Sequence, residues 1–195
     1  FFFKQKTAYE IYRCDWSSDV CSSDLYIYTS SEANSVSSLE LVKNACQKLG
    51  LNLVTQSITN SSEVKQAAET IVNRVDGIYL TTDNTVFSAL SSLIQVFEKA
   101  KKPIFSGDVT GAMNGGCAIA SGFNYYKAGR ATGEMVLQIL NGKKPSELPV
   151  RFMTEPEDFD LLFDLDSAKN CGIEIPKKYL DTASMIFENG KLIQK

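Results

Sequence analysis

Histidine is absent from the 195-residue chain, and tryptophan occurs only once. The lack of histidine excludes Ser-His-Asp and Cys-His catalysis, imidazole metal ligands and a histidine-based pH switch. The five cysteines show no CxxC or zinc-site spacing, so neither a metal site nor a complete disulfide framework is expected. No stretch approaches eighteen consecutive apolar residues, and no membrane-spanning helix is expected. We therefore expect a protein that is not an enzyme and uses no metal or cofactor.

An excess of positive charge is also missing, since 20 lysines and arginines face 23 aspartates and glutamates, for a net charge of −3. A chain of this charge offers no electrostatic footprint for nucleic acid or for an anionic membrane. The hydrophobic content of 44% over 195 residues is enough for one ordinary domain with a buried core. A small molecule is therefore the expected ligand, and nucleic acid is not an expected partner.

Residues 1–25 differ from the rest of the chain. They hold two of the five cysteines and the only tryptophan, and the triplet SSD at 17–19 recurs at 22–24. Residues 19–25 (DVCSSDL) can be back-translated to GAC GTG TGC TCT TCC GAT CT, which resembles a common sequencing-adapter string. We expect this segment to be a non-native or disordered extension without a packed place, with the native gene beginning upstream. The alternative is a genuine disordered or disulfide-bearing extension.

From residue 26 onward, short apolar strands alternate with amphipathic helices. Strands are predicted at 26–28, 51–54, 78–80, 104–105 and 118–120, and helices over 36–49, 64–75, 86–100 and 125–140. This alternation predicts an α/β fold with a parallel sheet and helices on both faces. Past residue 145 the pattern loosens into strands at 150–153 and 159–163, a short helix near 166–170 and a tail. No linker marks a clean second domain.

Three polar loops follow strands at the predicted carboxyl edge of the sheet: residues 29–35 (TSSEANS), 81–85 (TTDNT) and 106–116 (SGDVTGAMNGG). In open parallel sheets, ligands bind beyond this edge, where helix N-termini present backbone N–H groups. The glycine-rich loop has neither the Walker nor the GxGxxG pattern. The candidate ligand contacts are Ser30, Ser31, Asn34, Ser35, Thr82, Asp83, Asn84, Asp108 and Asn124.

Each of the strongest candidates also has a purely structural interpretation. Asn34 or Ser35 is suited to cap the helix that follows. Asp83 is suited both to pair with a ligand ammonium group and to cap its own helix, and Asp108 lies in a loop that is equally suited to be a plain surface connection. Because Asn caps helices about as well as Asp, the sequence predicts that Asp83→Asn leaves the fold intact.

A family resemblance extends over nearly all of residues 26–180. The segments YIYTSSEANS, VDGIYLTTDNTVFSAL, KKPIFSGD, GGCAIASGFNYYKAGRATGEMVLQILNGKKPSELPV and CGIEIPKKYL resemble, in that order, the second half of a family of ABC-transporter substrate-binding proteins. This family has the type I periplasmic-binding fold, and some members are linked to tryptophan, tyrosine or phenylalanine uptake. The resemblance implies two lobes that close on a small ligand, with an amino acid as the expected one, and present it to a membrane permease outside the cytoplasm.

The resemblance also divides the chain. It places residues 26–106 in the second lobe and residues 124–141 in a helix that returns from the first lobe, most of which is missing. The apolar stripe of that helix is then expected to stay exposed in this chain: Tyr125, Ala128, Met135, Val136 and Ile139.

The sequence departs from the family pattern at two places. Relatives usually have Pro-Thr-Asp-Asn at residues 81–84, and they often have aspartate where this chain has Asn124. The substitution at Asn124 removes a charge. Two other functions share this type of fold, namely the effector-binding part of a LacI-type transcription regulator and an enzyme on a flavodoxin-like sheet. The absence of histidine and of a phosphate-binding loop counts against the enzyme.

Overall fold

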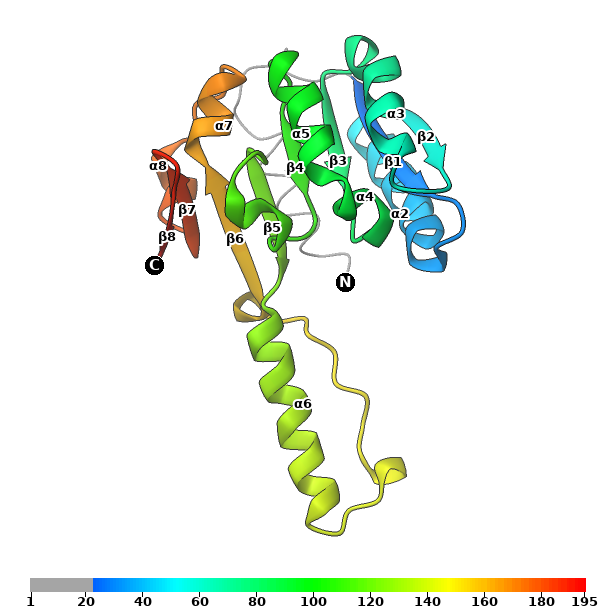
Figure 1. Ribbon diagram of the computed structural model, residues 1–195. Helices are drawn as coiled ribbons and strands as arrows, with labels where there is room; N and C mark the ends of the chain where they lie inside the picture. Colours follow the sequence, from blue (N-terminus) through cyan, green and yellow to red (C-terminus); the bar gives the residue numbers. More distant parts are fainter. Residues whose placement is uncertain (1–22) are drawn as a thin grey trace.

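The computed structural model describes residues 23–195, which form one eight-stranded sheet in the order β2-β1-β3-β4-β5-β6-β7-β8 (Figure 1). The strands are β1 (Ser23–Thr29), β2 (Asn52–Ile58), β3 (Gly77–Leu80), β4 (Ile104–Ser106), β5 (Ile119–Phe123), β6 (Phe159–Asp164), β7 (Met185–Glu188) and β8 (Lys191–Gln194). Neighbours from β2 to β5 are parallel, whereas β5 pairs with β6 and β7 pairs with β8 in antiparallel fashion. The predicted α/β fold with a mostly parallel sheet is confirmed.

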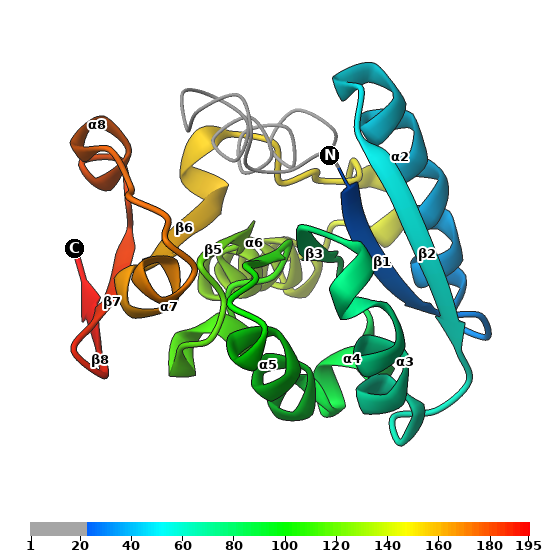
Figure 2. The ribbon, with the colours of Figure 1, turned by 90° about the horizontal axis from the view of Figure 1, so that it is seen from above.

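The helices cover both faces of the sheet, as the alternating pattern predicts. They are α2 (Ala33–Leu49), α3 (Glu63–Ile71), α4 (Asn84–Ser88), α5 (Leu90–Lys99), α6 (Tyr125–Leu140), α7 (Leu165–Asn170) and α8 (Lys177–Leu180). Alternate residues of a strand point to opposite faces, so Leu25 and Ile27 pack in one core with α3 and α5, while Tyr26 packs in the other with α2. Figure 2 shows α2 on the opposite side of the sheet from α3 and α5.

The strand β1 extends into the N-terminal segment that ends at residue 25. Ser23 and Leu25 belong to β1 and lie opposite Asn52 and Val54 of β2, and Leu25 is fully buried. Backbone pairing with β2 needs no particular side chain, and Leu25 fits the core, so residues 23–25 belong to the strand. The predictions that concern residues 1–22 lie outside the described residues, and the origin of residues 1–25 stays a prediction.

Helix ends follow local chemistry. The helix α2 ends at Gly50, whose φ of 69° is a left-handed conformation that favours glycine. Side chains cap three helix starts by accepting backbone N–H groups: Asp83 at α4, Asn124 at α6 and Asp164 at α7. The helix that we expected over 86–100 is instead interrupted at Ala89, between α4 and α5.

The long helix α6 leaves the sheet at the end of β5 and projects away from it, and the chain returns beside the helix to β6 (Figure 1). The only residue of α6 that is buried is Ala131. Tyr125, Val136 and Ile139 are exposed, as we expected of the apolar stripe, whereas Ala128 and Met135 are half-buried. None of the helices formed by residues 23–195 is long and apolar enough to cross a membrane.

Two predictions for the C-terminal part are wrong. Residues 150–153 form no strand, and Val150 and Phe152 are 75% and 76% exposed, because a strand forms only beside a partner and this segment lies away from the sheet. The predicted tail contains the β7–β8 hairpin. Its turn has positive φ at Asn189 and Gly190, and an Asn-Gly pair between two apolar runs is a hairpin signal that the sequence already carried.

Candidate functional site

The carboxyl ends of β1, β3, β4 and β5 meet at one edge of the sheet, because these strands are parallel. The first two polar loops touch there, since Asn34 Nδ2 donates to the Thr82 carbonyl oxygen over 2.8 Å. A cavity of about 330 Å³ opens at this edge, and its lining residues are Thr82, Asp83, Asn84, Phe87, Asp108, Thr110 and Tyr125. This volume is at the lower end of the range for small-molecule sites.

Asp83 joins the two strands that lie side by side at this edge. Its carboxylate is 2% exposed and accepts four hydrogen bonds. Oδ1 accepts from the Thr29 hydroxyl (2.8 Å) and from the backbone N–H of Val86 (3.0 Å). Oδ2 accepts from the backbone N–H of Thr29 (2.7 Å) and from the Ser35 hydroxyl (2.5 Å). The predicted capping role of Asp83 is therefore confirmed, and the four bonds leave little of the carboxylate for a ligand.

Glu32 supports the same helix start from the first loop. Its carboxylate accepts from the side chain and backbone N–H of Thr85 at 2.7 and 3.1 Å, and from the backbone N–H of Asn84 at 3.3 Å. The hydrogen bond from the Thr85 hydroxyl is the main cause that lowers the pKa of Glu32 below its usual value. The loops after β1 and β3 are therefore bound together by two carboxylates.

We expect Glu32→Gln to lower the free energy of unfolding by about 0.5–1.5 kcal/mol at neutral pH, because the amide nitrogen cannot accept from these N–H groups. The folded-state pKa of Glu32 is depressed. Its contribution is therefore present above the unfolded-state pKa of about 4.3 and is lost as the pH falls through the folded-state value. Urea midpoints of both proteins from pH 7 to about pH 3 should converge at the acid end. Glu174→Gln, at an exposed position, is the control, and a difference that persists in acid would contradict the prediction.

Asp108 faces the cavity with more capacity to bind than Asp83 has. It is 6% exposed, and Oδ1 accepts from the backbone N–H and hydroxyl of Thr110 at 2.8 and 2.5 Å. Oδ2 accepts a single hydrogen bond, from the Tyr125 hydroxyl at 3.0 Å. Burial and the neighbouring Asp108 charge raise the pKa of Tyr125 above its usual value, so this hydroxyl stays protonated and donates at neutral pH.

The carboxylates of Asp83 and Asp108 line the cavity, and no lysine or arginine of residues 23–195 lines it with them. The ion pairs recorded within residues 23–195 join Lys43 to Glu40, Lys65 to Glu69 and Arg151 to Glu134, and none involves Asp83 or Asp108. Carboxylates that are this deeply buried are normally paired or fully hydrogen-bonded. Asp83 is satisfied by four donors, whereas Oδ2 of Asp108 has room for another. The electrostatics therefore favour a cationic group on a ligand beside Asp108.

Only some of the other predicted contacts line the cavity. Thr82 and Asn84 line it. Ser35 is buried behind Asp83 and donates to it. Ser30 donates to the Ile58 carbonyl oxygen, and Ser31 is exposed. Neither Ser30 nor Ser31 is among the residues that line this cavity.

Asn124 lies outside the cavity lining and caps α6 through its Oδ1, which accepts from the backbone N–H of Lys127 at 2.9 Å. Its Nδ2 donates to Asp160 Oδ1 at 3.1 Å. An aspartate at this position would face Asp160 with a second negative charge. The amide is therefore suited to its neighbour, and a ligand contact by Asn124 stays a prediction.

Three lining residues are absent from the sequence-based candidates: Phe87, Thr110 and Tyr125. Phe87 lies four positions after Asp83, on the same side of the first helical turn. Tyr125 is the first residue of α6. Because it fits the apolar stripe of that helix, we interpreted it as a packing residue and not as part of a cavity lining. Phe87 lies outside the apolar stripe predicted for residues 86–100, and this position could have indicated a side chain that faces away from the helix core.

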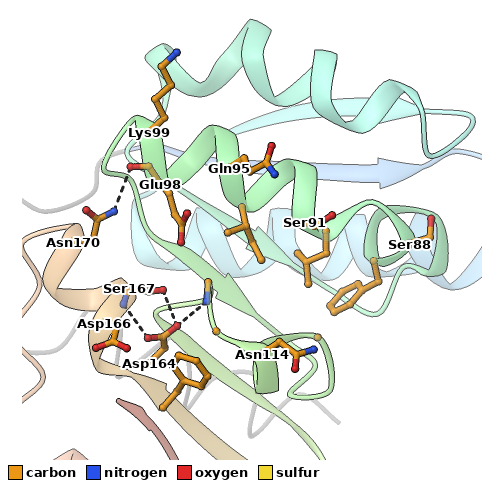
Figure 3. A pocket seen from close by; sticks show the side chains of 17 residues that line it. Ser88, Ser91, Gln95, Glu98, Lys99, Asn114, Asp164, Asp166, Ser167 and Asn170 are labelled. Atoms are coloured by element: carbon orange, nitrogen blue, oxygen red, sulfur yellow. Dashed lines mark hydrogen bonds between the residues drawn. The ribbon is translucent and has the colours of Figure 1, made fainter. Parts of the chain in front are cut away.

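A larger groove of about 1050 Å³ runs along α5 and reaches α7 (Figure 3). Its most buried carboxylate, Asp164, accepts from the backbone N–H and hydroxyl of Ser167 and from the backbone N–H of Gly116. Asn170 donates to the carbonyl oxygen of Glu98 across the groove. Because the groove follows the helix layer and Asp164 already accepts three hydrogen bonds inside the chain, the smaller cavity at the sheet edge is the candidate ligand site.

The mostly parallel sheet, covered on both faces and hollowed at its carboxyl edge, defines an α/β ligand-binding lobe of the periplasmic-binding-protein type. The chain belongs to the family of ABC transporter substrate binding proteins, whose family model matches residues 24–186. The expected family resemblance is thereby confirmed.

Individual relatives agree with this assignment. The "Tyrosine-binding protein" of Clostridioides difficile is 32% identical over 131 residues, which are 67% of this chain and 38% of that protein. A conserved domain protein from Vibrio cholerae superposes with a TM-score of 0.80 at 31% identity, over 93% of this chain and 60% of the other. An ABC domain from Streptococcus pneumonia in complex with L-Trp superposes with a TM-score of 0.79 at 26% identity, over 92% of this chain and 60% of the other. The chain thus spans between 38% and 60% of the length of these relatives.

Proposed function

We propose that this chain is part of the solute-binding component of an ABC importer and that it binds an amino acid in the cavity at the carboxyl edge of the sheet. The observation that carries the proposal is the buried Asp108 carboxylate, which lines the cavity with one oxygen bound only by Tyr125. A ligand ammonium group would supply the positive charge to pair with this carboxylate. The Thr82 hydroxyl and the side-chain oxygen of Asn84 also line the cavity for the polar part of the ligand, whereas the Thr110 hydroxyl and N–H are already bound by Asp108.

The relatives support the same class of ligand, since one is described as tyrosine-binding and another is a complex with L-Trp. The family match favours transport over the LacI-type regulator and over an enzyme. The protein then acts by binding, without chemical conversion, outside the cytoplasm and with a membrane permease as its partner. Asp83 as the direct ammonium anchor stays a prediction, and its four internal hydrogen bonds make Asp108 the better candidate.

The exposed helix α6 supports a two-lobe arrangement. Leu137 and Leu140 are exposed on it, and Val150 and Phe152 are exposed on the segment that returns to the sheet. Isolated apolar side chains on a surface are ordinary, but several together on one projecting unit indicate an interface. We propose that the remainder of the full-length protein covers this unit as the first lobe and closes the cavity from the side of Tyr125.

Calorimetric titration of the full-length protein with amino acids and with sugars tests the function. We expect one amino-acid site per protein, no binding of sugars, and recovery of the ligand unchanged after incubation. Binding of a sugar in preference to every amino acid, or conversion of the ligand to a product, would refute the proposal.

A further inference from the structure

The lining of the cavity includes two aromatic side chains, which we call its aromatic wall. Phe87 and Tyr125 both line the cavity, although they come from α4 and α6, which are far apart in the sequence. Phe87 is half-buried and packs against the core shared by α3 and α5. An aromatic ring held in this way offers a rigid apolar surface. A second aromatic ring that packs on it is stabilised by more than the burial of apolar area alone.

The position of Phe87 depends on one glycine. A Cβ atom added at Gly111 would lie 2.7 Å from Cε1 of Phe87 and 2.7 Å from Cδ2 of Leu90. Both distances are well below van der Waals contact, so the absence of a side chain at Gly111 is what lets the Phe87 ring occupy its present place. The interruption at Ala89 lies between these two side chains.

The same loop connects the aromatic wall to the carboxylate. Gly111 follows Thr110, whose backbone N–H and hydroxyl are both held by Oδ1 of Asp108. The carboxylate that we assign to the ligand ammonium therefore also fixes the loop that seats the Phe87 ring.

We propose that Phe87 determines the specificity of the site by packing against the side chain of an aromatic amino acid, and that Gly111 sets the position of its ring. This inference rests on the proposed function. It adds the residue that contacts the ligand side chain and thereby selects among amino acids. Neither residue contacts the ligand's ammonium group, so their effect is on the choice between amino acids.

The test compares Phe87→Leu with Phe187→Leu in the full-length protein. Phe187 is also half-buried and, like Phe87, lines the larger groove along α5, but it does not line the site. Calorimetry with L-tyrosine, L-tryptophan and L-leucine should show that Phe87→Leu lowers affinity for the two aromatic ligands by about twofold to tenfold. Affinity for L-leucine should change by less than about twofold, and Phe187→Leu should leave all three affinities unchanged.

Gly111→Ala is the second variant, because it moves the Phe87 ring without removing it. We expect it to lower the affinity for L-tryptophan more than for L-leucine. Wild-type protein that binds L-leucine more tightly than either aromatic ligand would overturn the inference, as would an equal loss for all three ligands in Phe87→Leu. Both results leave the amino-acid site itself standing, whereas failure of the wild-type protein to bind any amino acid refutes the proposed function.

Discussion

Replacement of Asp83 by alanine is expected to lower the free energy of unfolding by about 2–4 kcal/mol. The carboxylate accepts four hydrogen bonds at a position that is 2% exposed. Alanine leaves the backbone N–H groups of Thr29 and Val86 without this acceptor, and the link between β1 and β3 is lost with them. Urea unfolding of the variant should show a lower midpoint with an unchanged slope.

Asp83→Asn separates the structural prediction from the one made from sequence. Each carboxylate oxygen of Asp83 accepts one backbone N–H, from Val86 or from Thr29, and a backbone N–H cannot reverse its direction. In either orientation, the amide nitrogen therefore faces a donor, at a cost of about 1–3 kcal/mol. Asp181→Asn, at an exposed position, is the matched control. Stability equal to wild type in Asp83→Asn would restore the expectation that a capping asparagine is tolerated.

Asp108→Asn is expected to weaken amino-acid binding tenfold to hundredfold, which corresponds to the loss of about 1.5–3 kcal/mol from one charge-assisted hydrogen bond. The fold should change little. The amide oxygen can still accept from Thr110, and the nitrogen faces the Tyr125 hydroxyl, which can accept as well as donate. The substitution therefore removes the charge while it keeps the local hydrogen bonds.

The measurement is calorimetric titration of the full-length protein, accompanied by urea unfolding without ligand. Asp166→Asn provides a comparison, since this exposed aspartate accepts from the backbone of Asn189 and Gly190, away from the cavity. Unchanged affinity in Asp108→Asn, with a stable fold, would show that the ammonium group binds elsewhere, and Asp83 would then be the next residue to test.

Much of the lobe could be predicted because its elements are local. The apolar spacing of α2 and α3 indicates helices that bury one face, and the short apolar runs of β3 and β4 indicate strands that are covered on both sides. Gly50 marked the end of its helix because only a residue tolerant of positive φ fits there. The prediction at 150–153 failed because a strand needs a neighbour, which no local pattern supplies.

The site was predicted in part for the same reason. Asp83, Asn84 and Asp108 were identified because they follow strands, and parallel strands end together. The sequence could not show which of the two aspartates has its carboxylate fully occupied by hydrogen bonds within the chain. The donors to Asp83 come from Thr29 and Ser35, about fifty residues away, and only the pairing of β1 with β3 brings them to it.

The sequence by itself determined that this chain forms an α/β lobe with polar loops at one edge of a mostly parallel sheet, because hydrophobic periodicity and strand direction are properties of short segments. It also determined the family, through motifs in a fixed order. The tertiary structure alone decided that Asp83 is buried under four hydrogen bonds and that Asp108 retains capacity toward the cavity. It also decided that Phe87 and Tyr125 line one space. These are contacts between segments distant in the chain, and their geometry is fixed only when the whole sheet has been assembled.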